Sequence, residues 1–278
     1  MAQARPVFTG APTDRPALVG VVHLPPLPGS PRFAQARDAC DGDPHRAFET
    51  RVIEPALADA KALAEGGVDA IIVENFGDAP FFADAVPPET VAAMAAAARA
   101  VRQACGLPLG VNVLRNDAAS ALAVAAASGA SFVRVNVLAG AAVTDQGVIQ
   151  GKAAAVMRQR AALGLQDVKV WADVLVKHAS PLVGRPLEEE LHELLDRSLA
   201  DAVIATGAGT GRATDAGLVH QVRELAGDTP VLVGSGVTDQ TASAYPADGL
   251  IVGTWLKHDG RLFAPVDPDR VRRLRQRL

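Results

Sequence analysis

The stretch Val231-Leu232-Val233-Gly234-Ser235-Gly236-Val237-Thr238 decides how the rest of this 278-residue chain is interpreted. Its apolar start predicts a buried strand, which runs directly into Gly-Ser-Gly. The two glycines let the backbone approach a ligand closely, and Thr238 is placed to cap a following helix. Because the free N–H groups at a helix start attract anions, the stretch indicates an anion site; an ordinary tight turn is the alternative.

A second strand with a similar ending follows later in the chain. Leu250-Ile251-Val252 runs into Gly253-Thr254. Two neighbouring strands that end in glycine are typical of the phosphate site after strands 7 and 8 of a (β/α)8 barrel. The sequence therefore predicts that a phosphate is held by Gly234, Ser235, Gly236, Gly253 and Thr254.

The rest of the chain repeats a strand-then-helix pattern. Apolar segments that predict further strands lie at residues 17–22, 69–73, 108–114, 131–137, 168–174 and 202–206, each followed by a helical segment. Alternation of this kind implies parallel strands joined by right-handed crossovers. Because the number of units favours closure over an open doubly wound sheet, we expect a single (β/α)8 TIM barrel of the phosphate-binding type over residues 17–278, preceded by a tail or short cap at residues 1–16.

Composition excludes several classes of protein. Apolar residues make up 49% of the chain, which is ample for a large core, and the net charge of −4 without a long basic run argues against nucleic acid as a partner. Cys40 and Cys105 lie far apart, which fits a reduced protein without a zinc motif. We find no apolar run long enough to span a bilayer and no signal-peptide core, so a cytoplasmic protein is expected. Alanine-rich outer helices would permit a homo-oligomer.

Polar residues gather at the predicted strand ends, and the loops that follow are the long ones. This is the face on which barrel enzymes carry their chemistry. Glu74 and Asp173 are the candidate catalytic carboxylates, one as general acid or base and one to stabilise a cationic transition state, with His23 as a third catalytic candidate. The alternative is structural: either carboxylate could form a salt bridge to Arg134 or Lys177, and His23 could be a structural histidine.

A second group of residues is assigned to the substrate. Candidates for substrate binding are Asn112, Arg134, Asn136, Asp145, Lys177 and Thr206, and Gly207 and Gly209 of the glycine-rich segment 207–211 are added to the phosphate site. Asp145 lies in Thr144-Asp-Gln-Gly147, which is equally an ordinary turn, and Lys177 is equally a solvated loop lysine. No cofactor is predicted. A divalent metal on Glu74, Asp173 and His23 stays open, although no metal-ligand spacing supports it.

Taken together, these motifs resemble the BtpA/SgcQ family over nearly all of residues 17–278. The resemblance is carried by His23-Leu-Pro-Pro-Leu-Pro-Gly-Ser-Pro-Arg32, Val73-Glu-Asn-Phe-Gly-Asp-Ala-Pro80, Gly110-Val-Asn-Val-Leu-Arg-Asn-Asp117, Arg134-Val-Asn136, Thr144-Asp-Gln-Gly147, Ala172-Asp-Val174 with Lys177-His178, Thr206-Gly-Ala-Gly-Thr-Gly211 and Val233-Gly-Ser-Gly236. This chain departs from the family pattern at Ala205 and Ala208, where valine and serine are usual, and at Trp255, where another aromatic residue is frequent.

The resemblance implies a phosphate-binding barrel but leaves the activity open. One branch of the family is described as a photosystem I biogenesis factor, and another carries a nucleosidase assignment. We expect an enzyme that acts on a phosphorylated sugar or nucleoside, with cleavage of an N-glycosidic bond as the leading reaction. Isomerisation or aldol cleavage of a sugar phosphate would use the same kind of site, and a non-catalytic assembly factor for photosystem I is the alternative from a different class.

Overall fold

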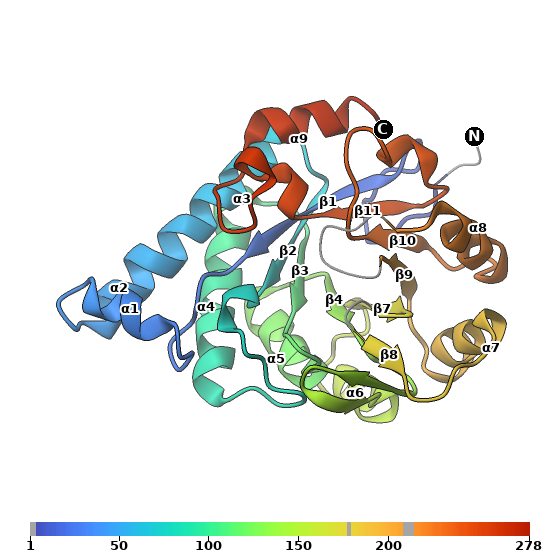
Figure 1. Ribbon diagram of the computed structural model, residues 1–278, viewed down its shortest axis with the longest axis horizontal. Helices are drawn as coiled ribbons and strands as arrows, with labels where there is room; N and C mark the ends of the chain where they lie inside the picture. The colour runs from blue at the N-terminus through green and yellow to red at the C-terminus, as the bar shows by residue number, and fades with distance from the viewer. Residues whose placement is uncertain (1–3, 177–178, 208–213) are drawn as a thin grey trace.

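The computed structural model describes residues 4–176, 179–207 and 214–278, and its centre is a closed parallel barrel (Figure 1). The barrel strands are β1 (Ala17–His23), β2 (Ala70–Glu74), β3 (Leu109–Asn112), β4 (Phe132–Val135), β7 (Lys169–Val174), β9 (Ala202–Thr206), β10 (Val231–Gly234) and β11 (Gly249–Val252). They pair in the order β1-β11-β10-β9-β7-β4-β3-β2, and β1 closes the barrel against β2. The predicted (β/α)8 barrel is confirmed.

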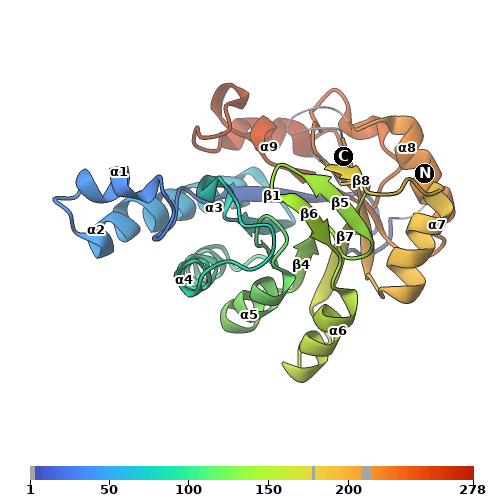
Figure 2. The ribbon, with the colours of Figure 1, turned by 60° about the horizontal axis from the view of Figure 1, so that its bottom comes forward.

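Helices surround the barrel. They are α1 (Phe33–Asp38), α2 (Pro44–Phe48), α3 (Glu54–Gly66), α4 (Pro88–Cys105), α5 (Ala118–Ser128), α6 (Ala153–Ala162), α7 (Leu187–His192), α8 (Ala216–Leu225) and α9 (Pro268–Arg275). Asp117, Asp215 and Asp267 cap α5, α8 and α9 by accepting backbone N–H groups. In the views of Figures 1 and 2, α1 and α2 extend away from the barrel. No helix in the described ranges is both long and apolar enough to cross a bilayer.

The helix predicted after Thr238 is wrong. Only a 3-10 turn, Ala242–Ala244, lies between β10 and β11, and the Thr238 hydroxyl accepts the N–H groups of Gln240 and Thr241. Pro246 explains the short turn, because a proline biases the residue before it away from the α conformation.

A β-hairpin lies between β4 and α6 and contains the turn expected at Thr144-Asp-Gln-Gly147. Strands β5 (Ala141–Thr144) and β6 (Gly147–Gln150) pair antiparallel, and β8 (Ala179–Pro181), which follows β7, pairs with the other edge of β5. Thr144-Asp145-Gln146-Gly147 forms the turn between the two hairpin strands. In Figure 2 this small sheet lies in front of the barrel strands β4 and β7.

Side chains of the barrel strands alternate between two cores. The outward side chains pack under the helices, whereas the inward ones form a separate core inside the barrel that includes Val19, Ile72, Phe132, Trp171, Ile204, Leu232 and Ile251. This alternation follows from the period of two in a strand. Its consequence for the site is that the last inward position of each strand opens onto the carboxyl end of the barrel.

The amino end of the barrel is closed by the segment before β1. Val7 and Phe8 are each 2% exposed, and the Phe8 ring stacks on Phe132, with 6.1 Å between the ring centroids. Phe132 in turn stacks on Trp171 at 3.7 Å, and the Trp171 indole N–H donates to the carbonyl of Val7 at 3.1 Å. The residues expected to form a tail or cap therefore fill this end with apolar side chains.

The same end carries a repeated ion-pair motif. Asp69, Asp201 and Asp248 each stand directly before a strand, namely β2, β9 and β11. Each accepts a backbone N–H from the start of a neighbouring strand (Leu18 at 2.7 Å, Val170 at 2.9 Å and Val231 at 2.8 Å) and binds an arginine (Arg15, Arg160 and Arg223). These contacts fix strand ends on the face of the barrel opposite the predicted site.

Candidate active site

Inward positions at the carboxyl ends of the strands hold most of the polar residues predicted from the sequence. Paired neighbours in the barrel register include His23 with Glu74 and Glu74 with Asn112. Arg134 of β4 stands opposite Trp171 of β7 in the register, and Asn136 and Asp173 lie two residues further towards the carboxyl end. Because His23, Glu74, Arg134 and Asp173 each follow an apolar inward residue of their own strand, the chain places a polar layer directly above the apolar barrel core.

Arg134 lies at the centre of this layer and binds both candidate carboxylates. Its Nε and Nη2 donate to the two carboxylate oxygens of Asp173, each at 2.9 Å, and its Nη1 donates to Oε1 of Glu74 at 3.3 Å. All three residues are 4% exposed. Burial alone would lower the pKa of Arg134, but the two carboxylates more than compensate and raise it above its ordinary value. The guanidinium is therefore charged throughout the working pH range.

Two asparagines complete the network. Asn112 Nδ2 donates to the same Oε1 of Glu74 at 3.2 Å, and Asn136 Nδ2 donates to Oδ2 of Asp173 at 3.0 Å. Both oxygens of Asp173 thus accept hydrogen bonds: Oδ1 from Arg134, and Oδ2 from Arg134 and Asn136. The Oδ1 atom of Asn136 is buried and finds no hydrogen-bond partner among the described residues. An amide oxygen in that position is available as an acceptor for a ligand.

A cavity of about 210 Å³ lies on the β1, β10 and β11 side of Arg134 and Glu74. Its lining includes Ser235, Gly236, Gly253 and Thr254. Ser235 and Gly236 both adopt left-handed backbone angles, with φ of 78° and 66°, and the Ser235 hydroxyl is buried without a partner in the described part of the chain. A left-handed non-glycine residue is uncommon and is typical of functional loops.

Hydrogen bonds from Thr214, which Tyr245 contacts in turn, hold the loop that contains Ser235 in place. The hydroxyl of Thr214 donates to the carbonyls of Gly234 at 3.0 Å and Ser235 at 3.3 Å, and the Tyr245 hydroxyl donates to the Thr214 carbonyl at 3.0 Å. These bonds fix the carbonyls, and with them the direction of the peptide groups that follow. On the other wall, a Cβ at Gly253 would lie 2.6 Å from Cε1 of His23, so glycine is required there for the imidazole ring.

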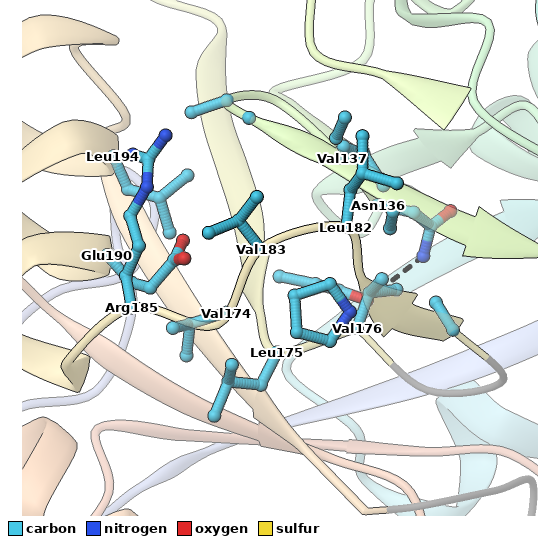
Figure 3. A pocket seen from close by; sticks show the side chains of 17 residues that line it. Asn136, Val137, Val174, Leu175, Val176, Leu182, Val183, Arg185, Glu190 and Leu194 are labelled. Carbon is cyan, nitrogen blue, oxygen red and sulfur yellow. Dashed lines mark hydrogen bonds between the residues drawn. The ribbon is translucent and has the colours of Figure 1, made fainter. Parts of the chain in front are cut away.

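Two further cavities meet the same polar layer. One, of about 490 Å³, is lined by Phe76, Phe81, Asn112, Arg115 and Asp145 in addition to Glu74 and Arg134. The other, of about 300 Å³, adjoins Asn136 and Asp173 and extends beneath the β5–β8 sheet towards α7 (Figure 3). Glu74, Arg134, Asn136 and Asp173 therefore lie where three neighbouring cavities meet.

The structure places the predicted site residues as follows. Glu74, His23, Asn112, Arg134, Asn136, Asp173, Ser235, Gly236, Gly253 and Thr254 share this region, and Asp145, exposed in the hairpin turn, reaches its edge. Gly234 is the buried last residue of β10, and Gly207 is buried directly after β9. The hydroxyl of Thr206, the last residue of β9, donates to the Leu175 carbonyl at 3.3 Å. Lys177 and Gly209 lie outside the described residues.

Arg115 belongs to the site and was missed in the sequence. It is 6% exposed and lies in the large cavity within the electrostatic reach of Asp173, Asp145, Arg134 and Glu74. Burial lowers its pKa, and the nearby carboxylates oppose that shift. Arg115 stands beyond the end of β3, so the period of two could not place it. The available signal was its position in the motif that ends Arg115-Asn116-Asp117.

The arrangement favours acid–base chemistry with charge stabilisation. Two carboxylates, Glu74 and Asp173, stand here beside the guanidinium groups of Arg134 and Arg115, so groups of both charge signs face a bound ligand. In the described ranges no group of three or more His, Cys, Asp or Glu side chains is positioned to hold a metal ion. Glu74 and Asp173 are instead joined through Arg134.

Comparison with known proteins gives a family and a fold. The sequence model described as "BtpA family" matches residues 14–278. An uncharacterised protein of Thermococcus kodakarensis is 45% identical over 267 residues, covering 94% of both chains. The "Photosystem I biogenesis protein BtpA" of Synechocystis is 43% identical over 256 residues, covering 91% of this chain and 85% of its own.

Among solved structures, N-(5'-phosphoribosyl)anthranilate isomerase from Pyrococcus furiosus superimposes with a TM-score of 0.52. The match covers 95% of this chain and 98% of the isomerase at 13% identity. At that identity the likeness concerns the barrel fold alone.

Proposed function

This chain belongs to the BtpA family, and on that premise we propose that it is an enzyme that acts on a phosphorylated sugar or nucleoside, with hydrolysis of the N-glycosidic bond of a phosphorylated nucleoside as the leading reaction. The observation that carries the proposal is the buried Glu74–Arg134–Asp173 network beside a cavity lined by Ser235–Gly236 and Gly253–Thr254. A phosphate in that cavity would place the sugar over the network. The phosphoribosyl compound named for the structurally similar isomerase supports a substrate of this class.

The two carboxylates receive different roles in this proposal. Asp173 is anchored by Arg134 and Asn136, so it is suited to stabilise positive charge on the sugar rather than to exchange a proton. Glu74, which Asn112 and Arg134 contact at one oxygen, Oε1, is the general base. Glu74 takes a proton from water, the water oxygen bonds to the anomeric carbon, and the C–N bond electrons leave with the nitrogen, which is protonated from solvent.

The proposal is tested by incubating the purified chain with 5'-mononucleotides and measuring release of ribose 5-phosphate. We expect turnover in the wild type and a loss of about 10²–10⁴-fold in Glu74→Gln, the range for removal of a general base. Glu188→Gln on the surface of α7 is the matched control and should retain wild-type turnover. Equal turnover in Glu74→Gln and Glu188→Gln would remove Glu74 from the mechanism, and no turnover in the wild type would contradict the proposed reaction.

A role in photosystem I biogenesis is the second candidate, because the Synechocystis relative that is 43% identical bears that description. This role predicts binding to a partner and no turnover. In an organism without photosystem I the assembly role does not apply.

A further inference from the structure

The cavity of about 300 Å³ beneath the small antiparallel sheet has a different chemistry from the rest of the site. Its walls come from the ends of β4 and β7, from β5 and β8, and from α7. The aliphatic residues that line it are Val137, Val174, Leu175, Val176, Leu182, Val183 and Leu194. Figure 3 shows Val183 between Arg185 and Glu190 on one side and Asn136 on the other. The cavity is therefore apolar, with polar groups confined to its two ends.

Several of these aliphatic side chains are exposed to water. Leu175 is 44% exposed, Leu182 is 57% exposed and Val183 is 68% exposed. Apolar surface in contact with water costs about 25 cal/mol per Å², so an apolar ligand that covered these side chains would gain free energy. Exposed large apolar residues that gather around a cavity are typical of a binding site.

The inner end of the cavity offers one directed hydrogen bond. Asn136 is 2% exposed, and its amide nitrogen is committed to Oδ2 of Asp173. That bond fixes the orientation of the amide, so the buried Oδ1, which has no partner in the described ranges, is held as an acceptor. A ligand that places an N–H here would satisfy it, and a ligand without one would leave it unpaired at a cost of about 1–3 kcal/mol.

The apolar cavity lies across the barrel from the cavity that Ser235, Gly236, Gly253 and Thr254 line. In the barrel order, β10, β11 and β1 line the Ser235–Gly253 side, whereas β4 and β7 lie across the barrel from them. Arg134 lines the Ser235–Gly253 cavity, and its partner Asp173 lines the apolar one. A ligand with phosphate at one end and an apolar group at the other would therefore cross the carboxylate network at its middle.

We propose that the apolar cavity is the specificity pocket for the leaving group of the substrate and that this group is a planar, largely apolar ring with an N–H, such as a heterocyclic base. This inference rests on the proposed phosphate-dependent function and narrows its substrate class. It separates N-glycosidic substrates from plain sugar phosphates, which would leave the aliphatic wall uncovered.

Binding of three probes to the wild type and to two variants tests the inference. The probes are ribose 5-phosphate, the 5'-mononucleotides of purines and pyrimidines, and the corresponding free bases, each titrated by calorimetry. Val183→Asp places a charge on the cavity wall at a residue exposed enough to tolerate it. Val148→Asp makes the same change on β6, where the side chain is 51% exposed and lies outside the cavity lining.

We expect Val183→Asp to raise the dissociation constant of a mononucleotide and of its free base by tenfold or more, the range for a disrupted apolar contact, and to leave ribose 5-phosphate within twofold. Val148→Asp should leave all three unchanged. Binding of no free base or mononucleotide to the wild type, or equal effects of the two variants, would overturn the inference. If the bases bind as expected but ribose 5-phosphate does not, the pocket stands and the phosphate-dependent function fails.

Discussion

Arg134 determines the electrostatics of the site at the scale of single residues. Two carboxylates buried without a cation would be expensive, because an ionised group taken out of water loses its hydration. Arg134 offsets this cost with two hydrogen bonds to Asp173 and one to Glu74. The same side chain therefore stabilises the barrel end and holds the candidate catalytic groups in position.

Replacing Arg134 with methionine should destabilise the fold by about 3–5 kcal/mol, since it removes the guanidinium that binds two buried carboxylates. The raised pKa of Arg134 keeps its charge, and so its stabilising contribution, present at all pH values below its ordinary pKa. In Arg134→Met the deficit should therefore stay the same from neutral to mildly alkaline pH, because Arg134 is charged throughout that range in the wild type. Urea unfolding at several pH values measures this, with the exposed Arg158→Met as control. A deficit that disappears as the pH rises within this range would show that the charge of Arg134 is not what stabilises the network.

The sequence identified most residues of this layer and offered Arg134 as a salt-bridge partner of either carboxylate, but it did not indicate that one guanidinium binds both. The period of two places Arg134 of β4 and Asn136 just beyond it on one face, and Glu74 ends β2 while Asp173 is the penultimate residue of β7. Which carboxylate contacts which cation depends on the barrel register and closure, which no single strand encodes. Arg115 lies past a strand end, where loop geometry decides the direction of a side chain, and was missed for that reason.

At the scale of elements, the three aspartates that precede β2, β9 and β11 explain how parallel strands are held in register at the amino end. Each supplies a carboxylate that accepts a backbone N–H of an adjacent strand and binds an arginine. Asp248 is the most buried of them, at 1% exposed, and also accepts the N–H of Arg5 at 2.7 Å. It thereby joins the amino-terminal segment, β10, β11 and Arg223 of α8.

Asp248→Ala should lower the free energy of unfolding by about 3 kcal/mol, because it leaves buried N–H groups and a guanidinium unpaired. Ligand binding at the opposite end of the barrel should be unaffected in the folded variant. Asp228→Ala, which removes a fully exposed partner of Arg5, is the control and should leave the urea midpoint unchanged. Comparable midpoints in the two variants would show that the motif does not stabilise the barrel.

Strands were predictable from the sequence where they are continuous apolar runs. The buried barrel strands are apolar runs bounded by turn residues, and all of them were found from the sequence. Strands β5, β6 and β8 cover the mouth of the barrel with mixed exposed and buried positions, so neither an apolar run nor a periodicity marks them. The helix expected after Thr238 failed because the capping signal is local and nothing in it reports the proline that follows.

Across the whole molecule, the two ends of the barrel differ in what fills them. The amino end is filled by Phe8, Phe132 and Trp171 and fixed by the aspartate–arginine pairs, whereas the carboxyl end carries the cavities and the buried charges. This division is general for the fold, since the loops at the carboxyl end can change without disturbing the core.

Phe8→Ala tests this separation. Removing a buried aromatic ring from the amino end should cost about 3–5 kcal/mol of stability, whereas Phe82→Ala, at a side chain that is 58% exposed, should change it little. Below its unfolding temperature, Phe8→Ala should bind ribose 5-phosphate as the wild type does. A weakened ligand affinity in the folded variant would show that the two ends are coupled.

The central claim is that a phosphate binds between Ser235–Gly236 and Gly253–Thr254 and so brings a sugar over Glu74 and Asp173. A crystal structure of the chain grown with ribose 5-phosphate measures this most directly. The account predicts density for the phosphate in that cavity, with the sugar directed towards Arg134. An unoccupied cavity at saturating ligand, or a phosphate bound elsewhere on the barrel, would contradict it.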